Sequence, residues 1–228
     1  MLREEFMAQL RKDDIPYTRY QIDKAEAYMR YILEMNKSIN LTAIKDEESF
    51  RELMLYDSLI PLKYCSMKNM KVLDIGTGAG FPGAILSIFV KGYFVLLDST
   101  AKKINVINGF KSLHAKTVCD RSEHYAQENR EYFDFVTARA VAPLNVLCEL
   151  ALPLVKVDGL FVAYKAKNAE KELEEAESAI KKLGGEVTLI TDDILSNGEE
   201  RHIIFIKKKK ETSKRYPREY SVITAKPL

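Results

Sequence analysis

The sequence feature that most restricts the possible folds of this chain is a glycine-rich segment, Asp74–Gly83. Its sequence is DIGTGAGFPG, and it directly follows the apolar segment Lys71–Ile75. A helix-compatible segment, Gly83–Val90, comes next. A buried strand, a glycine-rich turn and a helix are the opening unit of an open parallel sheet, in which ligands bind at the edge where the strands end. Because glycines carry no side chain, a ligand can approach this backbone closely.

The rest of the chain continues the alternation of strands and helices. Strands are predicted at 71–75, 94–98, 116–119, 133–138 and 159–164, and helices at 83–90, 101–113, 123–129, 144–155 and 169–183. Most of these strands are apolar at nearly every position, as is typical of strands buried on both faces of a parallel sheet. The segments 186–191 and 201–207 have no helix between them, which predicts a hairpin and an antiparallel last strand. We therefore expect an α/β fold with a doubly wound, seven-stranded, mostly parallel sheet.

Residues 1–62 are predicted to form a helical extension before this sheet. Apolar residues recur there at helical spacing, namely Ile22, Ala25, Met29, Ile32 and Leu33. A second helix is expected to start at Asp46 and to run toward Pro61. The sheet domain should then occupy residues 63–210. The tail, residues 211–228, follows the sheet domain, and the basic stretch from Lys207 onward is expected to be loosely held.

Composition narrows the possible functions. The chain has 228 residues, 46% of them hydrophobic, and a net charge of only +2, so attraction to a polyanion must come from a local patch. The three cysteines and three histidines are scattered, which predicts neither a metal site nor a redox motif. The N-terminus carries acids and lacks an apolar core, and no apolar stretch is long enough to span a bilayer. We expect a cytoplasmic protein that does not associate with membranes.

Three kinds of ligand compete for the glycine-rich segment. A dinucleotide site would need a third glycine where Phe81 stands, and a phosphate loop would need a Gly-Lys-Ser/Thr ending, which is absent. The spacing GxGxG after Asp74 suits a nucleoside without a pyrophosphate, namely S-adenosyl-L-methionine (SAM). Asp98 ends the next strand, where its carboxylate can accept both ribose hydroxyl protons. A tight turn without a ligand is the alternative, which the four glycines together with the two aspartates disfavour.

Two further groups are expected beside the same cofactor. Ser122 and Glu123 follow the third strand, where backbone groups could contact the adenine edge, although a helix N-cap is an equal alternative. Arg139 follows the fourth strand and is expected near the centre of methyl transfer as an orienting residue. The alternative for Arg139 is a surface ion pair.

Nine sequence segments together resemble one known family. They are NLTAI (40–44), DSL (57–59), DIGTGAGFPGAILSI (74–88), LLDS (96–99), RSE (121–123), TARA (137–140), YKAK (164–167), GEERH (198–202) and RYPR (215–218). Over nearly its whole length the chain resembles the bacterial RsmG (GidB) family of small-subunit ribosomal RNA guanine-7 methyltransferases. The resemblance implies SAM contacts from Gly76, Phe81, Ser122, Glu123 and Arg139. Gly78 and Asp98 are added from the glycine spacing and the ribose argument.

The resemblance also implies a substrate, which is one guanine of 16S ribosomal RNA, free or in a 30S-type particle, methylated at ring nitrogen 7. That nitrogen carries a lone pair and no proton, so we predict no catalytic base and a mechanism of positioning. Two alternatives stay open. One is a SAM methyltransferase that acts on another substrate, and the other is a non-catalytic module that binds RNA or a nucleotide.

RNA contacts are expected from basic residues near the end of the chain. Between Arg201 and Arg218 there are eight lysines or arginines and one acid, a pattern that favours salt-sensitive binding to phosphates. The predicted RNA-binding residues are Lys165, Lys167, Arg201, Lys207, Arg215, Tyr216 and Arg218, with Tyr216 able to stack on a base. The tail, residues 211–228, is expected to pack on or near this RNA-binding face. A solvated C-terminus is the alternative. The sequence departs from the family at Met35, at Met54 and after Arg218, and these departures concern RNA docking.

Overall fold

The computed structural model of residues 1–228 is built around one sheet. Its strands are β1 (Lys71–Ile75), β2 (Tyr93–Asp98), β3 (Lys116–Cys119), β4 (Phe133–Arg139), β5 (Val155–Lys165), β6 (Gly185–Ile190), β7 (Asp193–Ile194) and β8 (Glu200–Lys208). Seven of them follow one path in the order β3-β2-β1-β4-β5-β8-β6, and the short β7 pairs with β8 alone. The first five strands pair in parallel, whereas β8 runs antiparallel to β5 and β6. The predicted doubly wound, mostly parallel sheet with an antiparallel last strand is confirmed.

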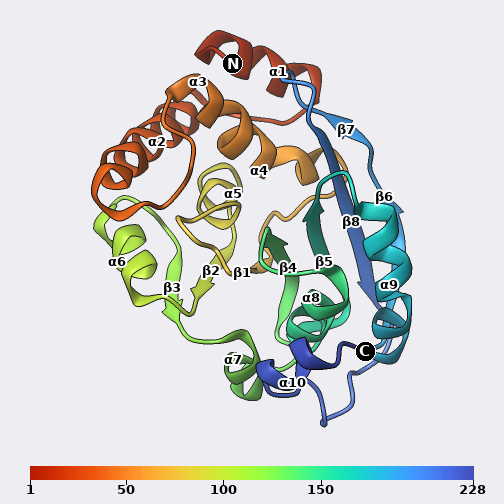
Figure 1. Cartoon of the computed structure of the whole chain (residues 1–228). Helices are drawn as coiled ribbons and strands as arrows, with labels where there is room; N and C mark the ends of the chain where they lie inside the picture. Colours follow the sequence, from red (N-terminus) through yellow and green to blue (C-terminus); the bar gives the residue numbers. More distant parts are fainter.

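Helices cover both faces of this sheet (Figure 1). They are α1 (Arg3–Lys12), α2 (Arg19–Ile39), α3 (Glu47–Phe50), a π-helical segment (Arg51–Tyr56), α4 (Asp57–Leu59), a 3₁₀ turn (Ile60–Lys63), α5 (Gly83–Phe89), α6 (Ala101–Gly109), α7 (Ser122–Glu128), α8 (Leu144–Ala151), α9 (Ala169–Lys182) and α10 (Tyr220–Ala225). Successive strand residues point to opposite faces. In β1, Val72 joins the core under α1, α2, α5 and α6, whereas Leu73 joins the core under α7, α8 and α9. Both faces are buried, which explains why the central strands are apolar at nearly every position.

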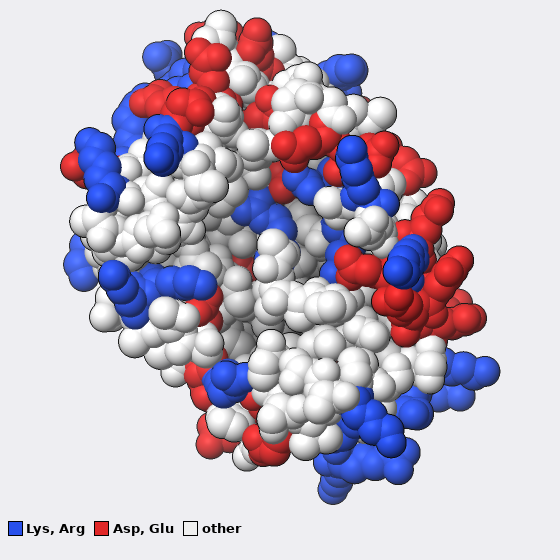
Figure 2. Space-filling model, viewed as in Figure 1, with Lys and Arg blue, Asp and Glu red and all other residues white.

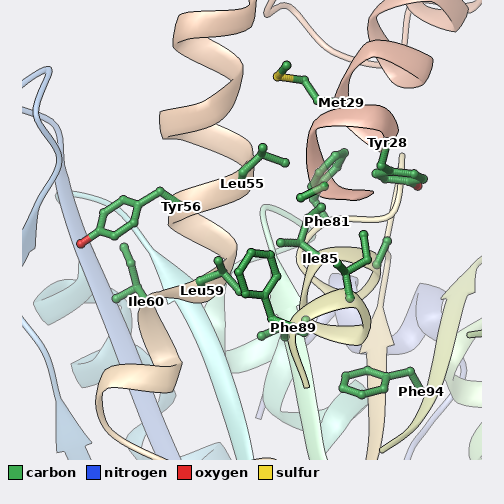
Figure 3. Packing of buried hydrophobic residues seen from close by; sticks show 14 of the residues in the cluster. Tyr28, Met29, Leu55, Tyr56, Leu59, Ile60, Phe81, Ile85, Phe89 and Phe94 are labelled. Atoms are coloured by element: carbon green, nitrogen blue, oxygen red, sulfur yellow. The ribbon is translucent and has the colours of Figure 1, made fainter. Parts of the chain in front are cut away.

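The N-terminal helices share a core with one face of the sheet. α2 begins with a capping box, in which the Thr18 side chain accepts a hydrogen bond from the Gln21 amide and the Gln21 side chain accepts one from the Thr18 amide. The apolar residues predicted along α2 are buried or partly buried in this core. Figure 3 shows Tyr28 of α2 and Leu55 and Leu59 of the following helical segments facing the Phe81–Phe89 region. Residues 1–62 therefore form one layer of the domain core.

The boundary between α8 and β5 differs from the prediction. The helix was expected to reach Val155, but it ends at Ala151 and the strand begins at Val155. Pro153 explains the early end, because proline has no backbone N–H with which to continue the helical hydrogen bonds. The exposed residues 156–158 conceal the start of the strand, since Lys156, Asp158 and the following Gly159 resemble a turn in the sequence.

The tail is folded against the domain, so the expectation that it is loosely held is wrong. Lys208 is fully buried and its Nζ donates to Thr212 Oγ1 at 2.6 Å and to two backbone carbonyl groups. The guanidinium of Arg130 donates to the backbone carbonyl of Tyr216 at 2.7 Å. In α10, Ile223 is fully buried against α8. These contacts could not be predicted from the basic segment, because the residues that the tail contacts lie far away in the sequence.

None of the helices combines the length and the apolar character that a bilayer span requires.

Candidate functional site

A pocket lies at the carboxyl edge of the parallel strands, between the segments that follow β1, β2, β3 and β4. Four of the predicted cofactor residues line it, namely Gly76, Asp98, Ser122 and Glu123. Leu97, Val141 and Leu150 form apolar parts of its wall. The sheet therefore brings together residues from four separate segments of the sequence, as the topology of an open parallel sheet predicts.

The glycine-rich segment presents a bare backbone beside this pocket. Gly76 and Gly78 have φ angles of +63° and +61°, a left-handed conformation that favours glycine. A Cβ atom on Gly76 would lie 2.5 Å from Val141 Cγ2, so the Val141 side chain packs directly on the Gly76 backbone and leaves no room for a side chain there. The nearest atom to a Cβ on Gly78 would be 3.9 Å away, which leaves open space in front of its backbone.

Asp74 braces the glycine-rich segment from inside and does not line the pocket. Its Oδ2 accepts hydrogen bonds from Thr77 Oγ1 at 2.6 Å and from the Gly83 amide at 2.9 Å, and its Oδ1 accepts one from Thr137 Oγ1 at 2.9 Å. Burial raises the pKa of Asp74 to about 6, against the lowering effect of these hydrogen bonds. The carboxylate therefore holds both ends of the loop and the neighbouring strand β4 in place.

This raised pKa predicts a pH-dependent stability. The ordinary pKa is 3.8 and the folded-state pKa is about 6, so the protonated carboxyl stabilises the fold fully below 3.8, and that contribution is lost as the pH rises through 6. The Asp74→Asn variant does not titrate there. Urea unfolding of both proteins between about pH 4.5 and about pH 6.5 should show the wild type losing stability relative to the variant as the pH rises. A difference that stays constant with pH would contradict this.

The carboxylate of Asp98 stands at the end of β2 and connects two loops. Its Oδ2 accepts a hydrogen bond from the Gly78 amide at 3.0 Å, and its Oδ1 accepts one from the Thr100 amide at 2.8 Å. Lys103 Nζ lies 3.6 Å from Oδ2. Each carboxylate oxygen has two lone pairs, so both oxygens can still accept a further hydrogen bond from a ligand in the pocket.

Ser122 and Glu123 open α7 at the rim of the pocket. No side chain caps this helix, so the alternative that Ser122 is an N-cap is wrong. Instead, its hydroxyl donates to the Leu150 carbonyl at 2.9 Å and joins α7 to α8. Glu123 accepts a hydrogen bond from Arg121 Nε at 2.5 Å. The side chains of both residues therefore fix the position of the helix start beside the pocket.

Phe81 points away from the pocket. Its ring packs against Tyr28, with ring centroids 5.7 Å apart, and against Phe50 at 5.4 Å, and only 4% of the residue is exposed (Figure 3). The prediction that Phe81 contacts the cofactor therefore does not fit its side chain, which belongs to the core shared with the N-terminal helices. Its backbone remains part of the glycine-rich segment.

The same N-terminal layer supports the loop through one hydrogen bond. Tyr28 Oη donates to the Ala79 carbonyl at 2.8 Å, and both groups are buried. Because the Tyr28→Phe change leaves that carbonyl without a donor, we expect the free energy of unfolding to fall by about 1.5 kcal/mol. Tyr31→Phe is the matched control, since it removes a bond of 2.8 Å to the Val106 carbonyl at a partly exposed site. Urea unfolding that gives equal losses for both variants would contradict the argument.

Arg139 lies beside the pocket in a buried ion pair, which corrects the alternative of a surface pair. Its Nη1 is 2.8 Å from Asp57 Oδ2 and 3.0 Å from the Leu53 carbonyl. The other oxygen of Asp57 accepts a hydrogen bond from Arg201 Nε at 2.6 Å. Asp57 is 1% exposed, whereas the two arginine side chains are 14% and 15% exposed. One carboxylate thus fixes two arginines, and Arg201 also lies 3.7 Å from the exposed carboxylate of Glu199.

Several predicted RNA-binding residues are engaged elsewhere in the fold. Lys165 is 8% exposed and its Nζ is 2.6 Å from Glu172, so it does not offer a free charge. The Tyr216 ring is buried in the core beneath α7, α8 and α9, which leaves no face for a base. Arg218 forms a two-pronged ion pair with Glu149, which is fully buried. These placements correct the expected roles of the three residues.

Other predicted RNA contacts lie at opposite ends of the sheet. Lys207 pairs with Leu160, whereas His202 pairs with Lys165 at the carboxyl edge, so Lys207 is about 16 Å from that edge. Arg201 and the exposed Lys167 are at the edge itself. Figure 2 shows many lysines and arginines gathered at the lower right, where Figure 1 places the C-terminus, and basic atoms also lie within the central hollow.

Sequence reasoning missed four residues that the fold brings to this edge. They are Asp57, Val141, Leu150 and Tyr220. The importance of Asp57 could have been predicted from the sequence, because Asp57 belongs to the DSL segment (57–59), which is one of the segments that resemble the family. No sequence pattern points to the other three residues, since each is an ordinary apolar or aromatic residue whose place depends on tertiary packing. No three His, Cys, Asp or Glu side chains are arranged so that they could hold a metal ion.

Comparison with known proteins identifies the family. A family model described as rRNA small subunit methyltransferase G (GidB) matches residues 21–204. A Bacillus licheniformis protein named ribosomal RNA small subunit methyltransferase G is 39% identical over 234 residues, which cover 99% of this chain and 98% of that protein. A protein of the same name from Halalkalibacterium halodurans is 41% identical over 233 residues and 98% of each chain.

Solved structures share the fold at low identity. A TehB-like SAM-dependent methyltransferase from Corynebacterium glutamicum matches with a TM-score of 0.54 and 17% identity, over 79% of this chain and 98% of that one. A ribosomal protein L11 methylase from Lactobacillus delbrueckii matches with a TM-score of 0.54 and 14% identity, over 69% and 80%. The resemblance predicted from the sequence is confirmed by the family model and the curated relatives. Because these matches extend over most or nearly all of its length, the chain belongs to the rRNA small subunit methyltransferase G family.

Proposed function

We propose that this protein transfers a methyl group from SAM to ring nitrogen 7 of one guanine in small-subunit (16S) ribosomal RNA, in the cytoplasm. One observation carries the proposal. The chain belongs to this family, and a single pocket is lined both by the glycine backbone that follows β1 and by the Asp98 carboxylate at the end of β2. The relatives are named as methyltransferases of small-subunit ribosomal RNA, which supports the choice of substrate.

The chemistry of the pocket fits the parts of SAM. The carboxylate after β2 has lone pairs available for two ribose hydroxyl groups. The apolar walls suit the faces of a planar base, and the polar rim at the start of α7 suits its edge. We assign the cofactor contacts to Gly76, Gly78, Asp98, Ser122 and Glu123, with Phe81 contributing through its backbone and Arg139 beside them.

The residues around the pocket act by positioning. Bound SAM supplies an electrophilic methyl group on a positively charged sulfur. Nitrogen 7 of guanine offers a lone pair without a proton, so the acceptor needs no general base, and alignment of the two partners provides the rate enhancement. Arg139 is the proposed orienting residue. Because Asp57 fixes its guanidinium, its remaining N–H groups are held ready for an acceptor such as the guanine oxygen.

The carboxyl edge also supports contact with RNA. Arg139 and Arg201 share the single buried carboxylate of Asp57, and the second acid near Arg201, Glu199, is exposed, so both guanidinium groups keep N–H donors for a further acceptor at this edge. We propose that Arg201 and Lys167 contact the RNA backbone there. Arg215 is exposed on another part of the surface, and we propose that it contacts a substrate as large as a 30S-type particle. Lys207 is partly exposed and its Nζ donates to the Asp158 carbonyl, so its contact with such a particle would need that bond to be exchanged.

The experiment that tests this function uses the full-length protein and SAM with a tritiated methyl group. Small-subunit RNA from cells that lack the protein is offered both as deproteinised RNA and as intact particles. We expect one methyl group per RNA molecule in at least one of the two forms, and mass mapping should find it as 7-methylguanosine. Transfer to neither form, or to another atom or base, would contradict the proposal.

A further inference from the structure

The C-terminal tail contributes a side chain to the cofactor pocket. Tyr220, at the start of α10, lines the pocket beside Leu150 of α8. The short helix is docked on α8 through Ile223, which is fully buried against Val146 and Leu150. One apolar side of the pocket is therefore formed by two helices that are distant in the sequence.

The chain just before α10 is fixed in place. Arg218 Nε lies 2.8 Å from Glu149 Oε1 and its Nη2 lies 2.6 Å from Oε2, and the Arg218 amide donates to the same carboxylate at 2.9 Å. A two-pronged pair with a fully buried carboxylate gives geometric precision as well as attraction. The position of Tyr220, two residues later, is thereby defined before any ligand binds.

Tyr220 is also joined to the loop that follows β3. The Arg121 guanidinium carbon lies 4.5 Å from the centre of the Tyr220 ring, and Arg121 Nε donates to Glu123 at 2.5 Å. A cation stacked near an aromatic ring is attracted by the ring quadrupole. The tail, the loop after β3 and the start of α7 therefore form one connected side of the pocket.

We propose that Tyr220 forms part of the wall that holds the base of the nucleoside cofactor, so that the tail is a component of the cofactor site. The inference rests on the proposed use of SAM. Aromatic side chains provide large, flat, apolar contact areas, which suit a planar purine. The neighbouring polar residues of the rim, Asp120 and Ser122, lie where the edge of such a base would be read.

The test measures binding of S-adenosylhomocysteine (SAH), the demethylated product of SAM, by calorimetry. We expect Tyr220→Ala to raise the dissociation constant about tenfold, because stacking between a base and an aromatic ring is lost. Tyr220→Phe keeps the ring and should bind SAH as the wild type does. Val222→Ala is the matched control, since Val222 lies in the same helix and is 46% exposed. A second measurement is hydrogen exchange of residues 219–225, which should slow when SAH is added.

The outcomes separate this inference from the proposed function. If the wild type binds no SAH, the proposed function fails. If the wild type binds but Tyr220→Ala binds equally well, and exchange in α10 does not change with SAH, the wall assigned to Tyr220 is wrong. A loss in Val222→Ala as large as that in Tyr220→Ala would also overturn it, because it would show that general loosening of the helix is the cause.

Discussion

Replacing Asp98 with alanine is expected to raise the dissociation constant for SAH about 100-fold, because a hydrogen bond to a charged group contributes about 1.5–3 kcal/mol. The proposed cofactor loses the acceptor of its ribose hydroxyl groups. The loop also loses a support, since the Gly78 amide donates to the same carboxylate at 3.0 Å. Calorimetry with the full-length protein measures the change directly.

Lys103→Ala is the matched control for this variant. Lys103 Nζ lies 3.6 Å from Asp98 Oδ2, and its side chain is 42% exposed. Removing it takes away a neighbouring charge but leaves the carboxylate, and a pair at 3.6 Å whose lysine is exposed to solvent contributes little. We expect the control to bind SAH within about threefold of the wild type. If Asp98→Ala also stays within that range, the ribose contact assigned to Asp98 is wrong.

The largest loss of stability is expected for Asp74→Ala. Three donors would lose their acceptor at once, namely the hydroxyls of Thr77 and Thr137 and the amide of Gly83. Each unsatisfied buried group costs about 1–3 kcal/mol, so we expect the free energy of unfolding to fall by about 5 kcal/mol. Urea unfolding followed by circular dichroism measures this change.

Asp74→Asn is the matched variant for the alanine change. The amide oxygen of the asparagine can accept the hydrogen bonds that Oδ2 of Asp74 receives. The amide nitrogen can donate to Thr137 Oγ1. The Thr137 hydroxyl can then donate its own proton to the Leu73 carbonyl, which lies 3.4 Å away. The asparagine variant should therefore keep most of the stability. Equal losses for the two variants would show that the hydrogen-bond network around Asp74 does not hold the loop.

The elements that the sequence predicts well are those with a local pattern. The apolar run 71–75, the glycines after it and the helix that follows all appear at nearly the predicted residues. The hairpin of β6 and β8 is also found, because two apolar segments without a helix between them leave few other arrangements. Asp98 and Gly76 could be placed in one pocket beforehand, since parallel strands bring their carboxyl ends to one edge.

Contacts between segments that are distant in the sequence could not be predicted. The basic tail resembles a solvated charge run, yet Lys208 meets Glu131 at 3.2 Å and Arg218 meets Glu149 in the interior. No periodicity links such pairs, because they lie in different elements and depend on how the layers stack. Tyr220 is the sharpest case, since only the docking of α10 on α8 brings it to the pocket.

The shared carboxylate of Asp57 has a consequence for how these sequences can diverge. Loss of Asp57 alone would leave the mostly buried guanidinium of Arg139 without its carboxylate and Arg201 with only the exposed Glu199, 3.7 Å away, and an unpaired buried charge is strongly destabilising. Loss of Arg201 first leaves a neutral pair, which is tolerable. Substitutions at these three positions are therefore expected to follow an order, in which an arginine is replaced before the aspartate.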